Sequence, residues 1–331
     1  MREFILLDKN LHEIGPTTLN ADFEVGTSSD STNDFKIETN IIDKTNFYAL
    51  YIPGTELGGI LNYDKSTNVT DLHALSGLTW RGILTRHIVE PPQNEDYKVV
   101  NGDLTTILAS LVADLSPIYY VDTTQLTGKT VTNYKINRYV NYLDAIDRLL
   151  SDNGYRLSLE VTKAAAGEPI RIKLSAIEQT VLNGVYNEDL YIPMLYEKDA
   201  AGYNHIIAAG RGELKDREIV NLYIDQDGNV SNTKYYTGIN ENTYFYDYSS
   251  VESLEELEKE AASKLNELKN KNMLSLSTTD TKDKRLLELE IGDVIKCVFP
   301  GGEVIDAPVT KKIYTVTNGN IVTQIKVKGE S

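Results

Sequence analysis

The chain has a single cysteine, Cys297, among its 331 residues. One thiol cannot form an intrachain disulfide, and a zinc site built from cysteines needs several. Cys297 lies in an apolar run between Lys296 and Val298, with no histidine or arginine beside it. We therefore interpret it as a small buried hydrophobic residue and expect no redox function.

Long apolar runs are also missing. No stretch of 18 or more apolar residues occurs, so we expect no transmembrane helix and no membrane insertion. The first eight residues contain one arginine, a patch of four apolar residues and then Asp8. That patch is shorter than the apolar region of a signal peptide, so we expect synthesis in the cytoplasm.

Basic residues are scarce relative to acidic ones. There are 33 lysines and arginines against 49 aspartates and glutamates, which gives a net charge of -16. Nucleic-acid affinity comes mainly from lysine and arginine neutralising phosphates, so we expect no specific binding to nucleic acid. A local basic patch gathered by folding is the less favoured alternative.

Motifs for catalysis, cofactors or metals are absent from the sequence as well. Among His12, His73, His87 and His205, no two lie three to five residues apart, so no helix-borne zinc pair exists. Neither a phosphate-binding glycine loop nor a serine nucleophile elbow occurs. We therefore predict no catalytic, cofactor-binding or metal-binding residue, although a site assembled from distant parts of the chain stays open.

The segment 225–229 (DQDGN) invites a calcium interpretation, which we do not favour. A calcium loop of the EF-hand type has glycine at its sixth position, whereas Gly228 is the fourth residue here. An Asp-Gly step between two alternating strands is a strong hairpin signal and accounts for every residue of the segment.

Acidic residues are so numerous that a catalytic pair among them could not be recognised from the sequence. A glycosidase needs only two well-placed carboxylates, and the sequence neither identifies such a pair nor excludes one. The candidates are Glu56, Glu90, Glu213 and Glu218, which more often anchor turns or pair with a nearby arginine, here Arg81, Arg86, Arg211 or Arg217.

Aromatic residues favour packing and contact surfaces. Trp80, in a predicted strand, is interpreted as part of a core rather than as a platform for a sugar. The 21 tyrosines suit either subunit interfaces or carbohydrate binding, because tyrosine offers a large contact area with a polar tip.

Residues 1–95 predict a β domain that resembles a barrel. The aromatic run 47–52 is a predicted strand, and Gly58-Gly59 permits a bulge or a barrel corner. Two further short strands are expected at 78–84 and 86–89.

Residues 96–200 predict an α+β insert. Asp103 is a suitable N-cap for the first helix, and Gly154 follows the second where a left-handed residue often ends a helix. In the second helix, we expect Leu143 and its apolar neighbours to be buried and Asp147 to point outward. The expected elements are helices at 104–115 and 141–153 and a hairpin of strands 155–161 and 170–174.

Residues 201–331 predict a second β-barrel-like domain with one amphipathic helix at 253–271. Asn318-Gly319 is a further turn signal. The expected strands are 218–225, 230–236, 286–290, 292–295, 311–317 and 321–327.

Several blocks, in a shared order along the chain, resemble a known family. They are 51–60 (YIPGTELGGI), 78–84 (LTWRGIL), 86–92 (RHIVEPP), 97–104, 138–140, 204–218 (NHIIAAGRGELKDRE), 222–225 and 290–294. Together they resemble the siphovirus Reqi-Pepy-type tail protein family, which is itself similar to the central hub of phage baseplates.

The resemblance implies a structural protein of a virion tail. It implies a mainly β fold with two β-barrel-like domains per chain, a homotrimer, and a pseudo-sixfold ring that joins the tail tube to the tip. The implied partners are further copies of the chain, a tail tube or distal tail protein, and tip, spike or receptor-binding proteins. DNA would pass through the ring without specific binding. The family implies no catalytic residues, cofactor or metal.

Two other functions stay open at this point. One is a tail-associated hydrolase of cell-wall glycan that uses two of the carboxylates above. The other is a carbohydrate-binding tail module, which tyrosines clustered in a groove would favour.

Overall fold

The computed structural model describes residues 3–39, 47–66, 73–163, 165, 167–186, 194–251, 253–279, 284–298, 302 and 304–330. The chain forms two compact units. Unit 1 comprises residues 1–194 and 275–329, and unit 2 comprises residues 195–274 and 330–331. The chain passes from one unit to the other within β14 (Met194–Asp199) and β19 (Lys271–Thr278).

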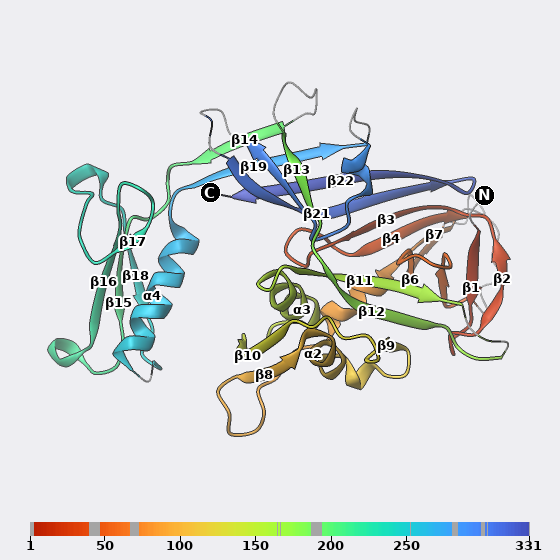
Figure 1. Ribbon diagram of the computed structural model, residues 1–331, viewed down its shortest axis with the longest axis horizontal. Coiled ribbons are helices and arrows are strands. Elements are labelled where there is room, and N and C mark those ends of the chain that lie inside the picture. The colour runs from red at the N-terminus through yellow and green to blue at the C-terminus, as the bar shows by residue number, and fades with distance from the viewer. Residues whose placement is uncertain are drawn as a thin grey trace. The chain divides into compact units, whose positions relative to one another are not determined.

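A large, mostly antiparallel sheet dominates unit 1 (Figure 1). Its strands follow the order β22-β21-β3-β4-β7-β6-β5-β1-β2, and β20 pairs with β21 and with β13. The strands are β1 (Phe4–Leu7), β2 (Glu13–Thr17), β3 (Asn20–Gly26), β4 (Asp34–Thr39), β5 (Ala49–Tyr51), β6 (Gly58–Ser66), β7 (His73–Thr79), β13 (Val181–Tyr186), β20 (Val294–Val298), β21 (Val304–Thr317) and β22 (Asn320–Glu330).

Phenylalanines from β1, β3 and β4 form the centre of one core of unit 1. The rings of Phe4 and Phe23 are 6.0 Å apart, and those of Phe23 and Phe35 are 5.5 Å apart, both stacked. Leu50 from β5 and Val316 from β21 complete this core. The mainly β architecture is therefore confirmed, whereas no sheet in the described part of the chain closes into a barrel.

The expected α+β insert lies against a second core of unit 1. Two helices, α2 (Leu104–Leu111) and α3 (Tyr142–Ser151), pack on the sheet β11-β12-β9 (Figure 1). Their N-caps are Asp103 and Asn141, whose side chains accept from the amides of Thr105 and Asp144. The strands are β8 (Lys98–Asp103), β9 (Tyr119–Val121), β10 (Thr130–Ile136), β11 (Tyr155–Thr162) and β12 (Arg171–Glu178).

Unit 2 is a four-stranded sheet covered on one face by a helix. The strand order is β17-β16-β15-β18, and the helix is α4 (Leu254–Leu268), which is shorter than the expected 253–271 and has Ser253 as its N-cap. Leu257, Ala261 and Leu265 of α4 pack on the sheet. The strands are β15 (His205–Ala209), β16 (Ile219–Ile224), β17 (Val230–Ser231) and β18 (Thr243–Asp247).

Helical turns replace strands in two predicted β runs. The run 78–89 is not a pair of strands, because β7 ends at Thr79 and α1 (Trp80–Ile83) and a 3-10 turn (Leu84–Arg86) follow. The run 286–290 contains α5 (Arg285–Glu288) instead of a strand. Leu286 and Leu289 are both buried at a spacing of three, which suits a helical turn better than a period of two.

The glycine pair 58–59 marks a close approach of strands and not the bulge we expected. The register shift in β6 lies further on, between Leu61 and Tyr63. A Cβ on Gly59 would lie 2.1 Å from the carbonyl oxygen of Leu78 on the neighbouring strand. Only glycine allows this spacing.

Candidate functional site

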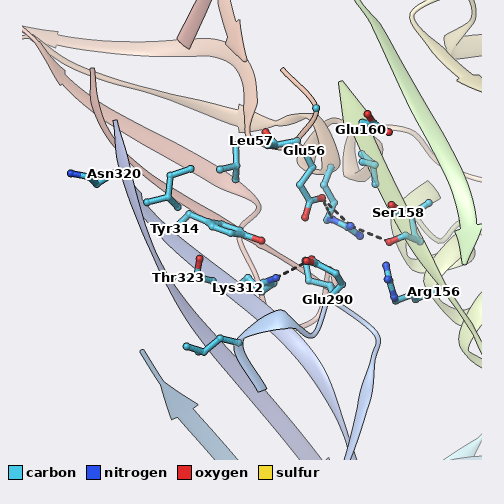
Figure 2. Close-up of a pocket in the computed structure, with 18 of the residues that line it drawn as sticks. Glu56, Leu57, Arg156, Ser158, Glu160, Glu290, Lys312, Tyr314, Asn320 and Thr323 are labelled. Atoms are coloured by element: carbon cyan, nitrogen blue, oxygen red, sulfur yellow. Dashed lines mark hydrogen bonds and ion pairs between the residues drawn. The ribbon is translucent and has the colours of Figure 1, made fainter. Parts of the chain in front are cut away.

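An open cleft of about 710 Å³ lies in unit 1. Its walls are the loop 54–57 between β5 and β6, the strand β11, and the hairpin of β21 and β22 (Figure 2). Ligand pockets in proteins commonly have volumes of about 300–1,000 Å³, so the cleft is large enough for a small ligand or a short peptide.

Arg81 forms the inner end of this cleft. Only 2% of the residue is exposed. Its Nε and Nη2 atoms each lie 3.0 Å from Oε2 of Glu56, and Nη2 also donates to the carbonyl oxygen of Leu157 at 3.3 Å. Nη1 is buried and has no hydrogen-bond partner in the described residues. The guanidinium therefore joins the loop before β6 to β11.

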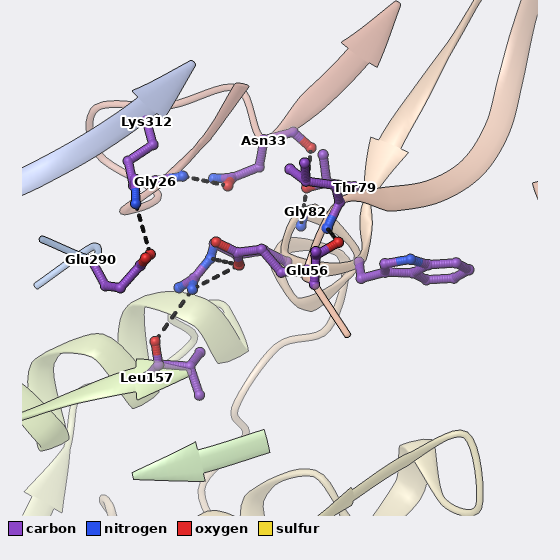
Figure 3. A network of polar contacts seen from close by, with 12 residues as sticks. Gly26, Asn33, Glu56, Thr79, Gly82, Leu157, Glu290 and Lys312 are labelled. Carbon is purple, nitrogen blue, oxygen red and sulfur yellow. Dashed lines mark hydrogen bonds and ion pairs between the residues drawn. The ribbon is translucent and has the colours of Figure 1, made fainter. Parts of the chain in front are cut away.

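The start of α1 fixes the position of Arg81 (Figure 3). The hydroxyl of Thr79 accepts from the amide of Gly82 at 3.0 Å and donates to the carbonyl oxygen of Asn33 at 2.9 Å. A Cβ on Gly82 would lie 2.2 Å from that same carbonyl oxygen, so the helix can approach Asn33 only with glycine there. The short helix turns Arg81 inward.

Two more ion pairs lie along the cleft. Arg156 donates from Nε to Oδ1 of Asp293 at 2.8 Å, and Asp293 also accepts from the amide of Thr180. Lys312 Nζ lies 2.9 Å from Oε2 of Glu290, and the Lys312 side chain is only 3% exposed (Figure 2). Each of the three cations in the cleft is therefore matched by a carboxylate.

Asp147 lies behind Arg81 and is the unusual titrating group of this region. Burial, reinforced by the negative charges of Asp144 and Glu56, raises the pKa of Asp147 to about 7, although Arg81 opposes the shift. Oδ2 of Asp147 is buried without a hydrogen-bond partner in the described residues. The expectation that Asp147 points outward from its helix is therefore wrong.

Tyr314 from β21 contributes a hydroxyl to the cleft (Figure 2). Burial and the charges of Glu56 and Glu290 raise the pKa of Tyr314 above its ordinary value. The phenol consequently keeps its proton at neutral pH and can donate a hydrogen bond.

This arrangement suits binding better than acid–base hydrolysis. Glu56 and Glu290 are each paired with a cation at 2.9–3.0 Å, whereas a glycosidase needs one carboxyl group placed to protonate a leaving group. The cleft also offers the phenol of Tyr314, small hydroxyl side chains and the exposed carboxylate of Glu160, which can bind a ligand through hydrogen bonds and charge.

The structure brings only one of the four candidate glutamates into the cleft. Glu56 pairs with Arg81, as expected. In unit 2, Glu218 lies 3.9 Å from Arg211. The other candidate residues lie elsewhere: Glu90, Glu213 and Arg86 are exposed, and Arg217 bonds to Asp247 and to the carbonyl oxygens of Ala209 and Gly210.

Three interpretations of single features are confirmed. Trp80 is fully buried in the core, although on a helix. Cys297 is buried, and burial raises the pKa of its thiol to about 12. The segment 225–229 is a turn between β16 and β17, in which Asp225 accepts from the amides of Asp227 and Asn229.

The histidines do not form a metal site in the described residues, where no group of three or more His, Cys, Asp or Glu side chains could hold an ion. His205 is instead held within unit 2. Its Nδ1 lies 2.9 Å from Glu241 and its Nε2 lies 3.0 Å from Asn221. Its ring stacks on Tyr223 at 4.4 Å.

Tyrosines do not gather in the cleft, where Tyr314 is the one tyrosine among the described lining residues. Several pack against each other in unit 2 instead, including the pair Tyr203 and Tyr244.

No helix in the described ranges is both long and apolar enough to cross a membrane.

The sequence did not identify Lys312 and Asp147 as residues of this site, for two different reasons. A register shift between Val309 and Lys311 moves the inward positions of β21 from odd to even residue numbers, and no sequence signal marks this bulge. Asp147 could have been found, because it lies four residues after Leu143 and three before Leu150, both of which are buried.

Comparison with known proteins shows which solved structures share this fold. No protein-family model matches the chain, and no curated protein matches it in sequence. The resemblance to the Reqi-Pepy-type family therefore stays a prediction.

Solved structures do match. The 43 kDa tail protein of prophage MuSo2 from Shewanella oneidensis is similar over 99% of this chain and 98% of its own, with a TM-score of 0.52 and 10% identity. A tail protein from Neisseria meningitidis MC58 is similar over 100% of this chain and 96% of its own, with a TM-score of 0.50 and 11% identity. The chain thus shares the fold of phage-type tail proteins along its whole length.

Proposed function

We propose that the chain is a structural hub protein of a phage or prophage-derived tail, of the Reqi-Pepy type. In this proposal it resides in the baseplate or tip of the virion tail and is not an enzyme. The observation that carries the proposal is the shared fold with two tail proteins, which extends over at least 99% of this chain. The ion-paired carboxylates of the cleft also favour a structural role over hydrolysis.

Three copies would form a ring with pseudo-sixfold symmetry. Each copy would contribute two β-rich parts, residues 1–95 and 201–331, on either side of the α+β part at 96–200. The ring would join the tail tube or a distal tail protein to the tip, spike or receptor-binding proteins. It would also line the channel for the tape measure and DNA, and the net charge of -16 would keep DNA from adhering.

Light scattering on the purified chain tests the ring. Three copies of a 37.0 kDa chain give a mass of 111 kDa, and we expect this value at micromolar concentration. A mass of 37.0 kDa at every concentration would contradict self-assembly.

A cell-wall digestion assay tests the hydrolase alternative. We expect no release of reducing sugar from purified peptidoglycan by the wild type or by Glu56→Gln. Release by the wild type that the Glu56→Gln variant lacks would overturn the structural proposal in favour of an enzyme.

A further inference from the structure

The cleft of unit 1 contains an open strand edge. In the sheet β11-β12-β9, as far as the chain is described, β11 is an outer strand and pairs antiparallel with β12 on one side only. In an antiparallel pair, residues alternate between those whose backbone groups bond the partner strand and those whose groups point away from it. The other edge of β11 therefore carries backbone groups at every second residue.

The hydrogen bonds of Val161 identify which residues point away. Its amide donates to the carbonyl oxygen of Thr55 at 2.9 Å, and its carbonyl oxygen accepts from the amide of Gly54 at 3.1 Å. Val161 thus faces the free edge, and so do Leu159 and Leu157, two and four residues earlier.

Part of this edge is already occupied by the chain itself. The loop at Gly54 and Thr55 forms hydrogen bonds with Val161 at one end of the edge. Arg81 Nη2 donates a hydrogen bond to the carbonyl oxygen of Leu157 further along it. The amide of Leu157 and both backbone groups of Leu159 are left facing the cleft, which these two residues line. An open edge of this kind is a template for a strand from another chain.

The charged residues that line the cleft indicate which kind of peptide strand would bind there. Arg81, Arg156 and Lys312 are each paired with a carboxylate. Glu160 also lines the cleft, is exposed and has no ion pair among the described residues (Figure 2). One negative charge is therefore unmatched, so a positively charged side chain is the complement.

We propose that the cleft binds an extended peptide segment of a partner protein, which adds as a strand to the edge of β11 at Leu157–Leu159 and places a lysine or arginine beside Glu160. The hydroxyl of Tyr314 and the side chains of Ser158 and Thr323 offer further hydrogen bonds to the added segment. Such a site does not require a trimer, so this proposal and the ring can fail independently.

Hydrogen exchange on the free chain tests the open edge first. Followed by amide NMR, Leu159 should exchange faster than Ser158, whose amide bonds to β12. Equally slow exchange at the two residues would show that the edge is covered and would overturn the proposal.

Titration with a defined peptide tests the occupant. The probe is acetyl-Thr-Val-Lys-Val-Thr-amide, compared with a version whose two valine nitrogens are methylated. At about ten times its Kd, the first peptide should slow exchange of Leu159 about tenfold, and the methylated peptide should not. Equal binding of the two peptides would mean simple charge attraction and would overturn strand addition, and so would the absence of any effect on Leu159.

Two matched variants test the charge. Glu160→Gln should weaken binding of the lysine peptide about twofold to fivefold, as expected for an exposed ion pair, whereas Glu178→Gln on β12 should leave it unchanged. Equal affinity of the two variants would contradict the role of Glu160. Binding of an N-acetylglucosamine tetramer at Ser158 and Thr323, without peptide binding, would identify a glycan site instead.

Discussion

At the scale of single residues, the cleft of unit 1 depends on charges that are buried and paired. Arg81 is 2% exposed and makes three contacts, two with Glu56 and one with Leu157. A buried charge whose partner is removed keeps its full desolvation cost. The stability of unit 1 should therefore be sensitive to substitutions that leave the shape of this site unchanged.

Glu56→Gln tests the central pair. The substitution removes the carboxylate that is bonded to the buried Arg81, so we expect the free energy of unfolding in urea to fall by about 3–5 kcal/mol. Glu267→Gln is the matched control, because Glu267 is 63% exposed in its pair with Lys264 and should cost at most about 0.5 kcal/mol. Equal losses in the two variants would show that the Glu56 pair is not strongly coupled to folding.

Asp147→Asn tests the raised pKa. The pKa of Asp147 is about 7 in the folded chain and about 3.9 in an unfolded one. Between these values the folded state holds the proton that the unfolded state has lost, so stability falls as pH rises from about 4 to 7. Asparagine cannot ionise and removes this loss.

We therefore expect the stability of Asp147→Asn relative to the wild type to increase with pH, by at most about 1.4 kcal/mol for each unit between pH 4 and 7. Urea unfolding at a series of pH values measures this difference. Asp96→Asn is the control, because it makes the same chemical change at an exposed position. A pH-independent difference for Asp147→Asn would contradict the shift.

The sequence located part of this site. Pairing with a nearby arginine was the more common role expected of the candidate glutamates, and Glu56 does pair with Arg81. The contribution of Lys312 was not predictable, because it depends on a bulge in β21 that reverses the faces of that strand. Local pattern identifies which residues alternate, but a single extra residue decides which of them point inward.

At the scale of elements, capping residues were the most dependable signals. The predicted cap Asp103 begins a helix, and Asn141 and Ser253, the first residues of the other two expected helices, are also N-caps. Thr79 was overlooked because the residues after it, Trp80 to Leu84, have the aromatic and branched character of a strand. The hydrogen bond that the Thr79 hydroxyl donates to the carbonyl oxygen of the distant Asn33 stabilises this helix start and is a tertiary contact, which no local pattern shows.

Thr79→Val tests this helix start. Valine keeps the shape of threonine but removes the hydroxyl that bonds both Gly82 and Asn33. We expect a loss of about 1–3 kcal/mol in the free energy of unfolding, because the amide of Gly82 becomes a buried donor without a partner. Thr79→Ser keeps the hydroxyl and should recover most of the loss, and equal stability of the two variants would argue against the cap.

At the scale of the whole molecule, the two units have separate cores. All buried residues of the two large cores in unit 1 come from its own two segments, and the core of unit 2 contains residues 206–265 only. The mainly β class and the positions of α2, α3 and α4 followed from sequence periodicity, whereas α1 and α5 lie where strands were expected. The insertion of one unit within the other did not, because pairing of the first strands with the last leaves no local signal.

Replacing residues 200–270 by a short glycine-serine linker tests this independence. We expect unit 1 to stay folded, because none of its core residues is removed. The amide NMR signals of β3, β4 and β11 should keep their positions, and thermal unfolding should stay cooperative. Collapse of these signals to a poorly dispersed spectrum would show that unit 1 needs unit 2.

The pairing of β3 with β21 also sets an order of events during synthesis. Phe23 lies opposite Tyr314, so one strand of this pair leaves the ribosome almost 300 residues before the other. Unit 2 can complete its core once Leu265 has emerged, while β3 still has an unpaired edge. The part of the chain that is made first is therefore completed last. During translation the edge of β3 stays unpaired the longest, so it is the segment where we expect chaperones to bind.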